Sequence, residues 1–234
     1  TMYDTQTIRP GASSIAIWSE AVGKDSHAAT ELHEQQLVSF LLSRGDVRSM
    51  LLDEMGLSGE TFVRESVVEP FVLDRNKKPG DIDILLCDPK RPQRAVAVEV
   101  KRTKVRDDGT GSQKVTKLQG IAGGVDQAKA LAEMGFGQVY LPIIVVVDGR
   151  SDALQGDNFF NRGTTRDTSE KIIEFSGWSA LRPDVGILYI EVVQPVDRSI
   201  LETGVIGLAI AKPAEIREQP SDTTARLVRF FGIR

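Results

Sequence analysis

Residues 79–101, PGDIDILLCDPKRPQRAVAVEVK, constrain the fold more than any other stretch of this chain. Two short apolar runs, residues 82–87 and 95–100, flank a link with the sequence DPKRPQ. Short runs rich in Val, Ile, Leu and Ala are typical of strands, and a link with two prolines favours a close connection between them. The stretch therefore predicts an antiparallel hairpin centred near Arg91.

The predicted register of this hairpin gathers charged side chains on one face of a sheet. Around a centre at Arg91, Asp83 lies opposite Glu99. Because side chains alternate between the two faces of a strand, Asp81, Asp83, Glu99 and Lys101 share one face. Their companions on that face are small or apolar, which favours a covered patch where carboxylates need a cation or a metal ion. The alternative is a half-solvated face on which Lys101 only neutralises Glu99.

A covered cluster of carboxylates suits a hard divalent cation. Magnesium takes oxygen ligands, often from one or two carboxylates together with water and phosphate oxygens. Asp83 and Glu99 are the principal candidates, with Asp81 as a neighbouring carboxylate. The backbone carbonyl of Val100 is a further candidate oxygen.

The order of these residues resembles the PD-(D/E)XK nuclease superfamily. The matching text is PGDID…EVK, with Asp83 (or Asp81) followed on the next strand by Glu99 and Lys101. The resemblance implies an α/β fold with a restriction-endonuclease-like core, whose mixed central sheet combines an antiparallel meander with a parallel crossover strand, flanked by helices. It also implies magnesium- or manganese-dependent hydrolysis of phosphodiester bonds in DNA. Asp83 and Glu99 would hold the metal, and Lys101 would orient or help deprotonate the attacking water.

Two further residues gain a role only from this resemblance. The superfamily often carries a glutamate on its first helix that reaches the metal, and Glu34 matches it better than Glu31, because Leu37 and Leu41 follow Glu34 by one and two turns. By itself, a glutamate in a first turn complements the helix dipole. Gln127 resembles a glutamine at the start of the second helix in a RecB-like and resolvase-like subset. A polar first-turn residue is an equal alternative.

The elements expected around the hairpin follow from apolar periodicity. They are helices over 26–44 and 46–60, strands over 14–18 and 61–73, a helix over 125–136, a buried strand from Ile143, and two late strands over 185–193 and 205–211. Pro142 has no N–H to give to a ladder, which is why the fully paired strand is expected to begin at Ile143. Strand, helix and strand over 94–102, 125–135 and 143–147 predict a crossover unit with parallel strands.

A polar stretch follows the second strand of the hairpin. Residues 103–117, TKVRDDGTGSQKVTK, lack apolar periodicity and contain two glycines, which predicts a mobile loop. The stretch carries four basic residues, Lys104, Arg106, Lys114 and Lys117, and Arg102 directly precedes it. These are either solvated surface charges or a basic flap over the backbone of a nucleic acid. Lys77 and Lys78, in the turn before the hairpin, have the same two interpretations.

Length and composition describe an ordinary globular chain. With 234 residues, a single domain over 1–234 is expected, with an arm over 1–25, a nuclease-like core over 26–148 and a C-terminal extension of the sheet over 149–234. The net charge of −4 does not point to a nucleic-acid binder, but a local basic strip suffices for one.

Cysteine use and hydropathy bear on the compartment. The one cysteine, Cys87, lies inside a predicted strand, where it packs as a small apolar residue. A single cysteine cannot form an internal disulfide, which favours a reducing, cytoplasmic location. No apolar run reaches transmembrane length, so no membrane partner is expected.

The sequence leaves open whether the protein forms a homodimer or a larger complex. The rival function is a catalytically inactive, nuclease-like scaffold that binds nucleic acid or protein.

Overall fold

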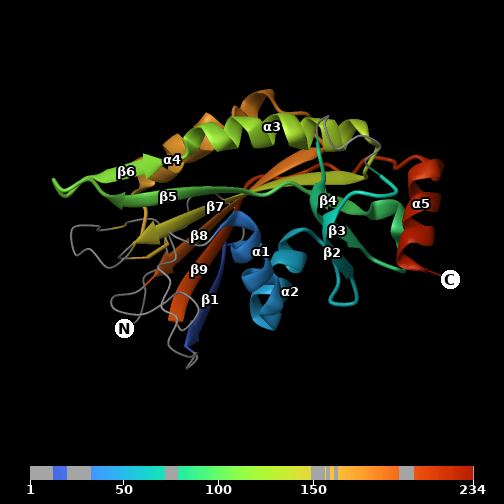
Figure 1. Cartoon of the computed structure of the whole chain (residues 1–234), viewed down its shortest axis with the longest axis horizontal. Helices are drawn as coiled ribbons and strands as arrows, with labels where there is room; N and C mark the ends of the chain where they lie inside the picture. Colours follow the sequence, from blue (N-terminus) through green and yellow to red (C-terminus); the bar gives the residue numbers. More distant parts are fainter. Residues whose placement is uncertain are drawn as a thin grey trace.

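The computed structural model describes residues 13–19, 33–71, 79–148, 156, 159–160, 163–194 and 203–233. These residues form an α/β fold with one mixed sheet flanked by helices (Figure 1). The strands are β1 (Ser13–Ser19), β2 (Phe62–Val67), β3 (Ile82–Cys87), β4 (Val96–Val98), β5 (Lys101–Asp107), β6 (Gln113–Thr116), β7 (Gln138–Asp148), β8 (Val185–Gln194) and β9 (Thr203–Lys212). The helices are α1 (Glu34–Ser43), α2 (Gly45–Glu54), α3 (Leu118–Glu133), α4 (Arg166–Phe175) and α5 (Ser221–Phe231), with short 3-10 turns at Pro92–Arg94 and Trp178–Ala180.

The sheet combines antiparallel and parallel pairing, as the sequence predicts. Its strands run in the order β1-β9-β8-β7-β4-β3-β2, and β5 joins it by pairing with β7 and with β6. The central strand β7 is parallel to β4, β5 and β8, whereas the other pairs are antiparallel. The expected parallel crossover through α3 is therefore confirmed. The two late strands extend the same sheet.

Helices cover both faces of the sheet. In Figure 1, α3 and α4 lie on one face, while α1 and α2 lie on the other. The apolar run of β7 serves both cores: Ile143, Val145 and Val147 pack with the α3 side, and Ile144 and Val146 pack with the α1 side. A strand buried on both faces explains why this run is continuously apolar. None of the helices in the described ranges is long and apolar enough to cross a membrane.

The central hairpin has the predicted register. Leu86 pairs with Val96 and Ile84 with Val98, so the pairing is centred on residue 91 and brings Asp83 level with Glu99. One side chain departs from the expected alternation: Ile82 packs with the cluster on the α3 side rather than beside Ile84. The departure lies next to Ser66 of β2, whose φ of 52° interrupts the neighbouring ladder.

The predicted mobile loop over 103–117 is wrong. These residues form a hairpin of β5 and β6, and β5 also pairs in parallel with β7 from Lys101 to Val105. Thr103 and Val105 are fully buried, and that alternation is hidden in the sequence by the charged residues between them. The two glycines lie in the tight turn of the hairpin, where Gly109 and Gly111 have φ values of 87° and 86°.

Helix α3 begins at Leu118, well before the predicted start at residue 125. Glycines at 120, 123 and 124 suggested a loop because glycine is a poor helix former, yet all three lie inside the helix. Gly124 has a packing reason: a Cβ there would collide with Lys101 Cγ and lie 3.0 Å from Lys101 Cε. Gln127 is therefore in the middle of the helix and not in its first turn.

The remaining boundaries differ in smaller ways. β7 already begins at Gln138 and includes Pro142, contrary to the predicted start at Ile143. β2 ends at Val67, so the strand predicted over 61–73 is too long, because Pro70 has no N–H for a ladder. The helix predicted over 26–44 is wrong at His33, which is extended and forms the N-cap of α1, so α1 itself begins at Glu34. Glu31, Lys77, Lys78 and most of the arm over 1–25 lie outside the described residues.

Candidate active site

The sequence-predicted residues meet at a gap in the sheet. Pairing between β3 and β4 ends at Val98, and pairing between β5 and β6 begins at Lys104. Among the strands that the structure describes, none pairs with residues 99–103 on that side, whereas β7 continues along the other side. The chain between β4 and β5 thus offers open backbone groups toward the gap.

Two carboxylates occupy this open edge. The N–H groups of Val100 and Arg102 point to the same side, because alternate residues of an extended strand do so. Val100 N–H donates to Asp83 Oδ2 over 2.7 Å, and Arg102 N–H donates to Glu34 Oε2 over 2.7 Å. Asp83 comes from β3 and Glu34 from the first turn of α1, so the two carboxylates replace the carbonyls of a missing strand.

Pro142 explains why the strand is interrupted here. On the other side, Glu99 N–H donates to the carbonyl of Tyr140 over 3.0 Å. In the regular alternation of a parallel ladder, the carbonyl of Glu99 would then accept from residue 142, and proline has no N–H. The ladder with β7 resumes at Lys101, opposite Ile143. The proline therefore lies where β4 ends and β5 begins.

Lys101 is the cation of the cluster. Its Nζ lies 2.6 Å from Glu99 Oε1 and 3.5 Å from Glu34 Oε1. Its stem packs against Gly124 of α3, which leaves room for it by having no side chain. Burial lowers the pKa of Lys101, but the opposing attraction of Glu99 and its hydrogen bond raise the pKa above the ordinary value. The amine is therefore held as an ammonium ion.

Glu99 is the most deeply buried carboxylate of the cluster. It is 0 % exposed, and its Oε2 atom has no hydrogen-bond partner in the described structure. Burial, followed by the nearby Asp83, raises the pKa of Glu99 to about 8 despite Lys101. Burial also raises the pKa of Asp83 to about 6, against the Val100 hydrogen bond, which lowers it. Burial thus makes the ionised forms of both carboxyl groups costly unless a cation offsets their charge.

An acidic cleft adjoins these residues. It has a volume of about 310 Å³ and is lined by four carboxylates, Glu34, Glu65, Asp81 and Asp83, with Gln35, Val38, Ser66 and Val68. Its walls come from α1, β2 and the chain entering β3. Asp81 thus lies on the cleft beside Asp83, while Glu65 is an acidic wall residue that the sequence reading did not single out.

Gln127 is not part of the carboxylate cluster. Its side-chain amide donates to the carbonyl of Pro79 over 3.0 Å. This bond ties α3 to the segment that leads into Asp81 and Asp83. The contact suits a positioning residue rather than one that touches a substrate.

The donor set was compared with what a metal ion requires. Within the described ranges, no group of three His, Cys, Asp or Glu side chains is arranged to hold a metal ion. Magnesium, however, is commonly held by one or two carboxylates, with water and phosphate oxygens filling its other positions. The buried, unpartnered Oε2 of Glu99 and the adjacent carboxylate of Asp83 fit that smaller requirement.

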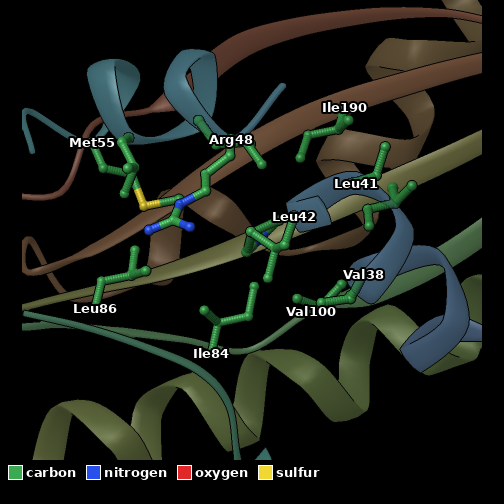
Figure 2. A pocket seen from close by; sticks show the side chains of 13 residues that line it. Val38, Leu41, Leu42, Arg48, Met55, Ile84, Leu86, Val100 and Ile190 are labelled. Atoms are coloured by element: carbon green, nitrogen blue, oxygen red, sulfur yellow. The ribbon is translucent and has the colours of Figure 1, made fainter. Parts of the chain in front are cut away.

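A second hollow near the site is apolar and belongs to the core. It has a volume of about 30 Å³ and lies beneath α1 and α2. Figure 2 shows the side chains of Val38, Ile84 and Val100 around it. Arg48 also lines it, but its guanidinium donates to the carbonyl of Thr61. Val100 therefore anchors its side chain in this core while its backbone faces the gap.

Sequence reasoning missed the part that two residues play in shaping the site. Gly124 and Pro142 carry no reactive group, yet one admits Lys101 and the other interrupts the strand at Glu99. Their signals are present in the sequence: a Gly-Gly pair before an amphipathic helix, and a proline inside a buried apolar run.

Neither a protein-family model nor a curated protein matches this chain.

Proposed function

We propose that this protein is a metal-dependent nuclease that hydrolyses phosphodiester bonds in DNA, built on a restriction-endonuclease-like core. The observation that carries the proposal is the convergence of Asp83, Glu99 and Lys101 at the gap in the sheet. Lys101 Nζ lies 2.6 Å from Glu99, and Asp83 binds the backbone of the residue between them. A buried carboxylate with an unpartnered oxygen is costly to keep unless a ligand uses it.

Each residue has a role in this proposal. Asp83 and Glu99 would hold magnesium or manganese, and the carbonyl of Val100 and the carboxylate of Asp81 are further candidate ligands. Such an ion lowers the pKa of a bound water and stabilises negative charge on a phosphate. Lys101 orients the attacking water and offsets the charge that develops on the phosphate. Glu34 holds Lys101 in place and fixes the start of β5.

The rival proposal is a nuclease-like scaffold that binds nucleic acid or protein without cleaving it. Two observations favour it: Lys101 already neutralises Glu99, and no set of three metal-binding side chains is found among the described residues. In that case the cluster would hold the sheet together at the gap. The two proposals differ in whether Lys101 is needed for chemistry.

The test is cleavage of labelled single-stranded, double-stranded and branched DNA, and of RNA, with magnesium or manganese. Lys101→Ala should lower the cleavage rate by about 10²-fold or more, because acid–base and electrostatic help are lost, while Tm stays near that of the wild type. Calcium should support binding more than cleavage, since its looser coordination activates water less well. A wild type that cleaves none of these substrates with either metal leaves the scaffold.

The two aspartates give a matched pair within the same experiment. Asp83→Asn should lose nearly all activity, because Asp83 is level with Glu99 and contacts the chain beside it. Asp81→Asn should keep part of the activity, since Asp81 lies one residue pair further out. The reverse order of activities would assign the principal ligand to Asp81.

A further inference from the structure

One face of the β5–β6 hairpin carries a row of cations. Arg102, Lys104 and Arg106 occupy alternate positions of β5, and alternate residues of a strand share a face. Arg102 and Lys104 pair with Ile144 and Val146 of β7, which pack on the α1 side, so the row lies on that side. Figure 1 shows β6 beside α4, with the tip of the hairpin projecting beyond that helix at one end of the molecule.

At the outer end of this row, two positively charged residues lie directly opposite each other. Arg106 pairs directly with Lys114 across the hairpin, and both side chains are exposed. Like charges directly opposite each other destabilise a strand pair. Neither side chain forms an ion pair within the described residues, although Asp108 at the hairpin tip lies near Lys114. Two opposed cations at such a position indicate an anionic ligand.

The inner end of the row carries an independent sign of a ligand. Arg102 is only 7 % exposed, and its Nη1 atom has no hydrogen-bond partner in the described part of the chain. A buried guanidinium donor without an acceptor is costly unless a ligand supplies one. Its backbone N–H is bound by Glu34, which lines the acidic cleft. The row therefore runs from the edge of the cleft to the tip of the hairpin.

We infer that this face binds consecutive phosphates of a nucleic-acid strand and leads the strand to the cleft. Alternate strand residues lie about 6.6 Å apart, so Arg102, Lys104 and Arg106 span about 13 Å in a line. A line of cations fits a linear polyanion better than a single phosphate. The inference rests on the proposed function for its choice of nucleic acid, and it adds the surface on which the substrate backbone lies.

The test compares two double variants of equal charge change. Arg106→Gln with Lys114→Gln removes the opposed pair, and Arg94→Gln with Arg229→Gln removes two exposed arginines near α5, at the opposite end of the molecule in Figure 1. Binding of labelled duplex DNA is measured over a range of salt concentrations, with calcium in place of magnesium. The salt slope should fall by about 1.8 in the hairpin variant, because each phosphate contact contributes about 0.9. Its Tm should be equal to or above that of the wild type, since a repulsion is removed.

The control variant should bind with the salt slope of the wild type. Equal slopes in all three proteins would overturn the inference, as would a wild type that binds no DNA or an equal loss in both variants. Cleavage of a small phosphodiester by the wild type separates this inference from the proposed function. If the wild type cleaves it and the hairpin variant binds DNA normally, only the inference fails. If the wild type cleaves nothing and the hairpin variant loses its salt slope, only the proposed function fails.

Discussion

Two glutamates buried in the same sheet, Glu99 and Glu191, differ in the hydrogen-bond partners of their carboxylate oxygens. Both are 0 % exposed. Glu191, in β8, accepts hydrogen bonds from Thr164 N–H over 2.9 Å, from Thr164 Oγ1 over 2.5 Å and from Tyr189 OH over 3.2 Å. Glu99 has Lys101 on one oxygen and no partner in the described structure on the other.

The difference separates a carboxylate whose two oxygens both accept hydrogen bonds from one whose second oxygen has no partner in the described structure. The neutral donors around Glu191 satisfy both of its oxygens and fix the segment at Thr164 to the sheet. Close packing supports this: a Cβ on Gly163 would collide with the Glu191 carboxylate. Glu99 instead keeps an unsatisfied lone pair in a low-dielectric place, which is where a bound cation gains most.

The largest effect is expected from removing the satisfied carboxylate. Glu191→Ala should lower the free energy of unfolding by about 3 kcal/mol or more, because it removes the acceptor of the buried hydrogen bonds from Thr164 and Tyr189 and opens a cavity. Urea denaturation measures the loss. Glu99→Gln is the comparison, and its loss should stay below about 1 kcal/mol at neutral pH. The pKa of about 8 favours the protonated carboxyl of Glu99 there, which the amide resembles in shape, and Glu34 still faces Lys101. An equal loss in both variants would contradict the comparison.

The second expected effect is a pH dependence that belongs to Glu99. Its pKa is raised from 4.5 to about 8 in the folded protein, so its stabilising share is complete below pH 4.5 and is lost as pH rises toward 8. Asp83, with a pKa of about 6, acts in the same direction, whereas the raised pKa of Lys101 acts only in alkaline solution. The free energy of unfolding of the metal-free protein should therefore fall by a few kcal/mol over this range, since one pKa unit is worth about 1.4 kcal/mol and the two carboxyl groups act together.

Two controls sharpen the pH measurement. Glu99→Gln should flatten most of the decline, because the amide does not titrate. Magnesium should also reduce it, and binding at neutral pH should release protons, since a carboxylate ligand must be ionised. Calorimetry in buffers of different ionisation enthalpy measures that release. A wild-type protein whose stability rises from pH 4.5 to 8 without metal would contradict the assigned burial of Glu99.

The smallest effect concerns the space that admits Lys101. Gly124→Ala should lower the free energy of unfolding by about 1 kcal/mol and also lower the cleavage rate, because the new Cβ displaces Lys101. Gly123→Ala is the matched control in the same helix. A Cβ at Gly123 meets nothing within 4 Å, so this variant should be about 0.5–1 kcal/mol more stable than the wild type. Thermal unfolding measures the stability of both variants. An equal gain in stability for Gly124→Ala and Gly123→Ala would contradict the close packing of Lys101 on Gly124.

The central hairpin could be predicted because its physical signals agree. Two apolar runs and a proline-bearing link fix both the strands and their register, so Asp83 and Glu99 were matched correctly. Glu34 lies 3.5 Å from Lys101, while its expected support of a metal ion stays a prediction. Gln127 contacts the carbonyl of Pro79 instead. The agreement of strand pattern, link and register is what allowed a local sequence to specify a tertiary contact.

The errors arose where tertiary packing overrides local preference. In β5, charged side chains mask the alternation of Thr103 and Val105, and parallel pairing with β7 supplies the order that the sequence pattern lacks. In α3, the low helix propensity of Gly124 is outweighed by close packing on Lys101. Pro142 was expected to delay the strand, but β7 tolerates it because the neighbouring strand is interrupted at the same level.

The carboxylates at the gap in the sheet divide their two oxygens between separate duties. Asp83 gives Oδ2 to the Val100 N–H, and Glu34 gives Oε2 to the Arg102 N–H, so one oxygen of each group joins the halves of the sheet. The other oxygen of each group remains for Lys101 or a ligand. Asn at position 83 and Gln at position 34 should therefore keep the hydrogen bond to the backbone N–H while removing the negative charge. Alanine at either position would remove both the hydrogen bond and the charge, so the amides are the informative replacements.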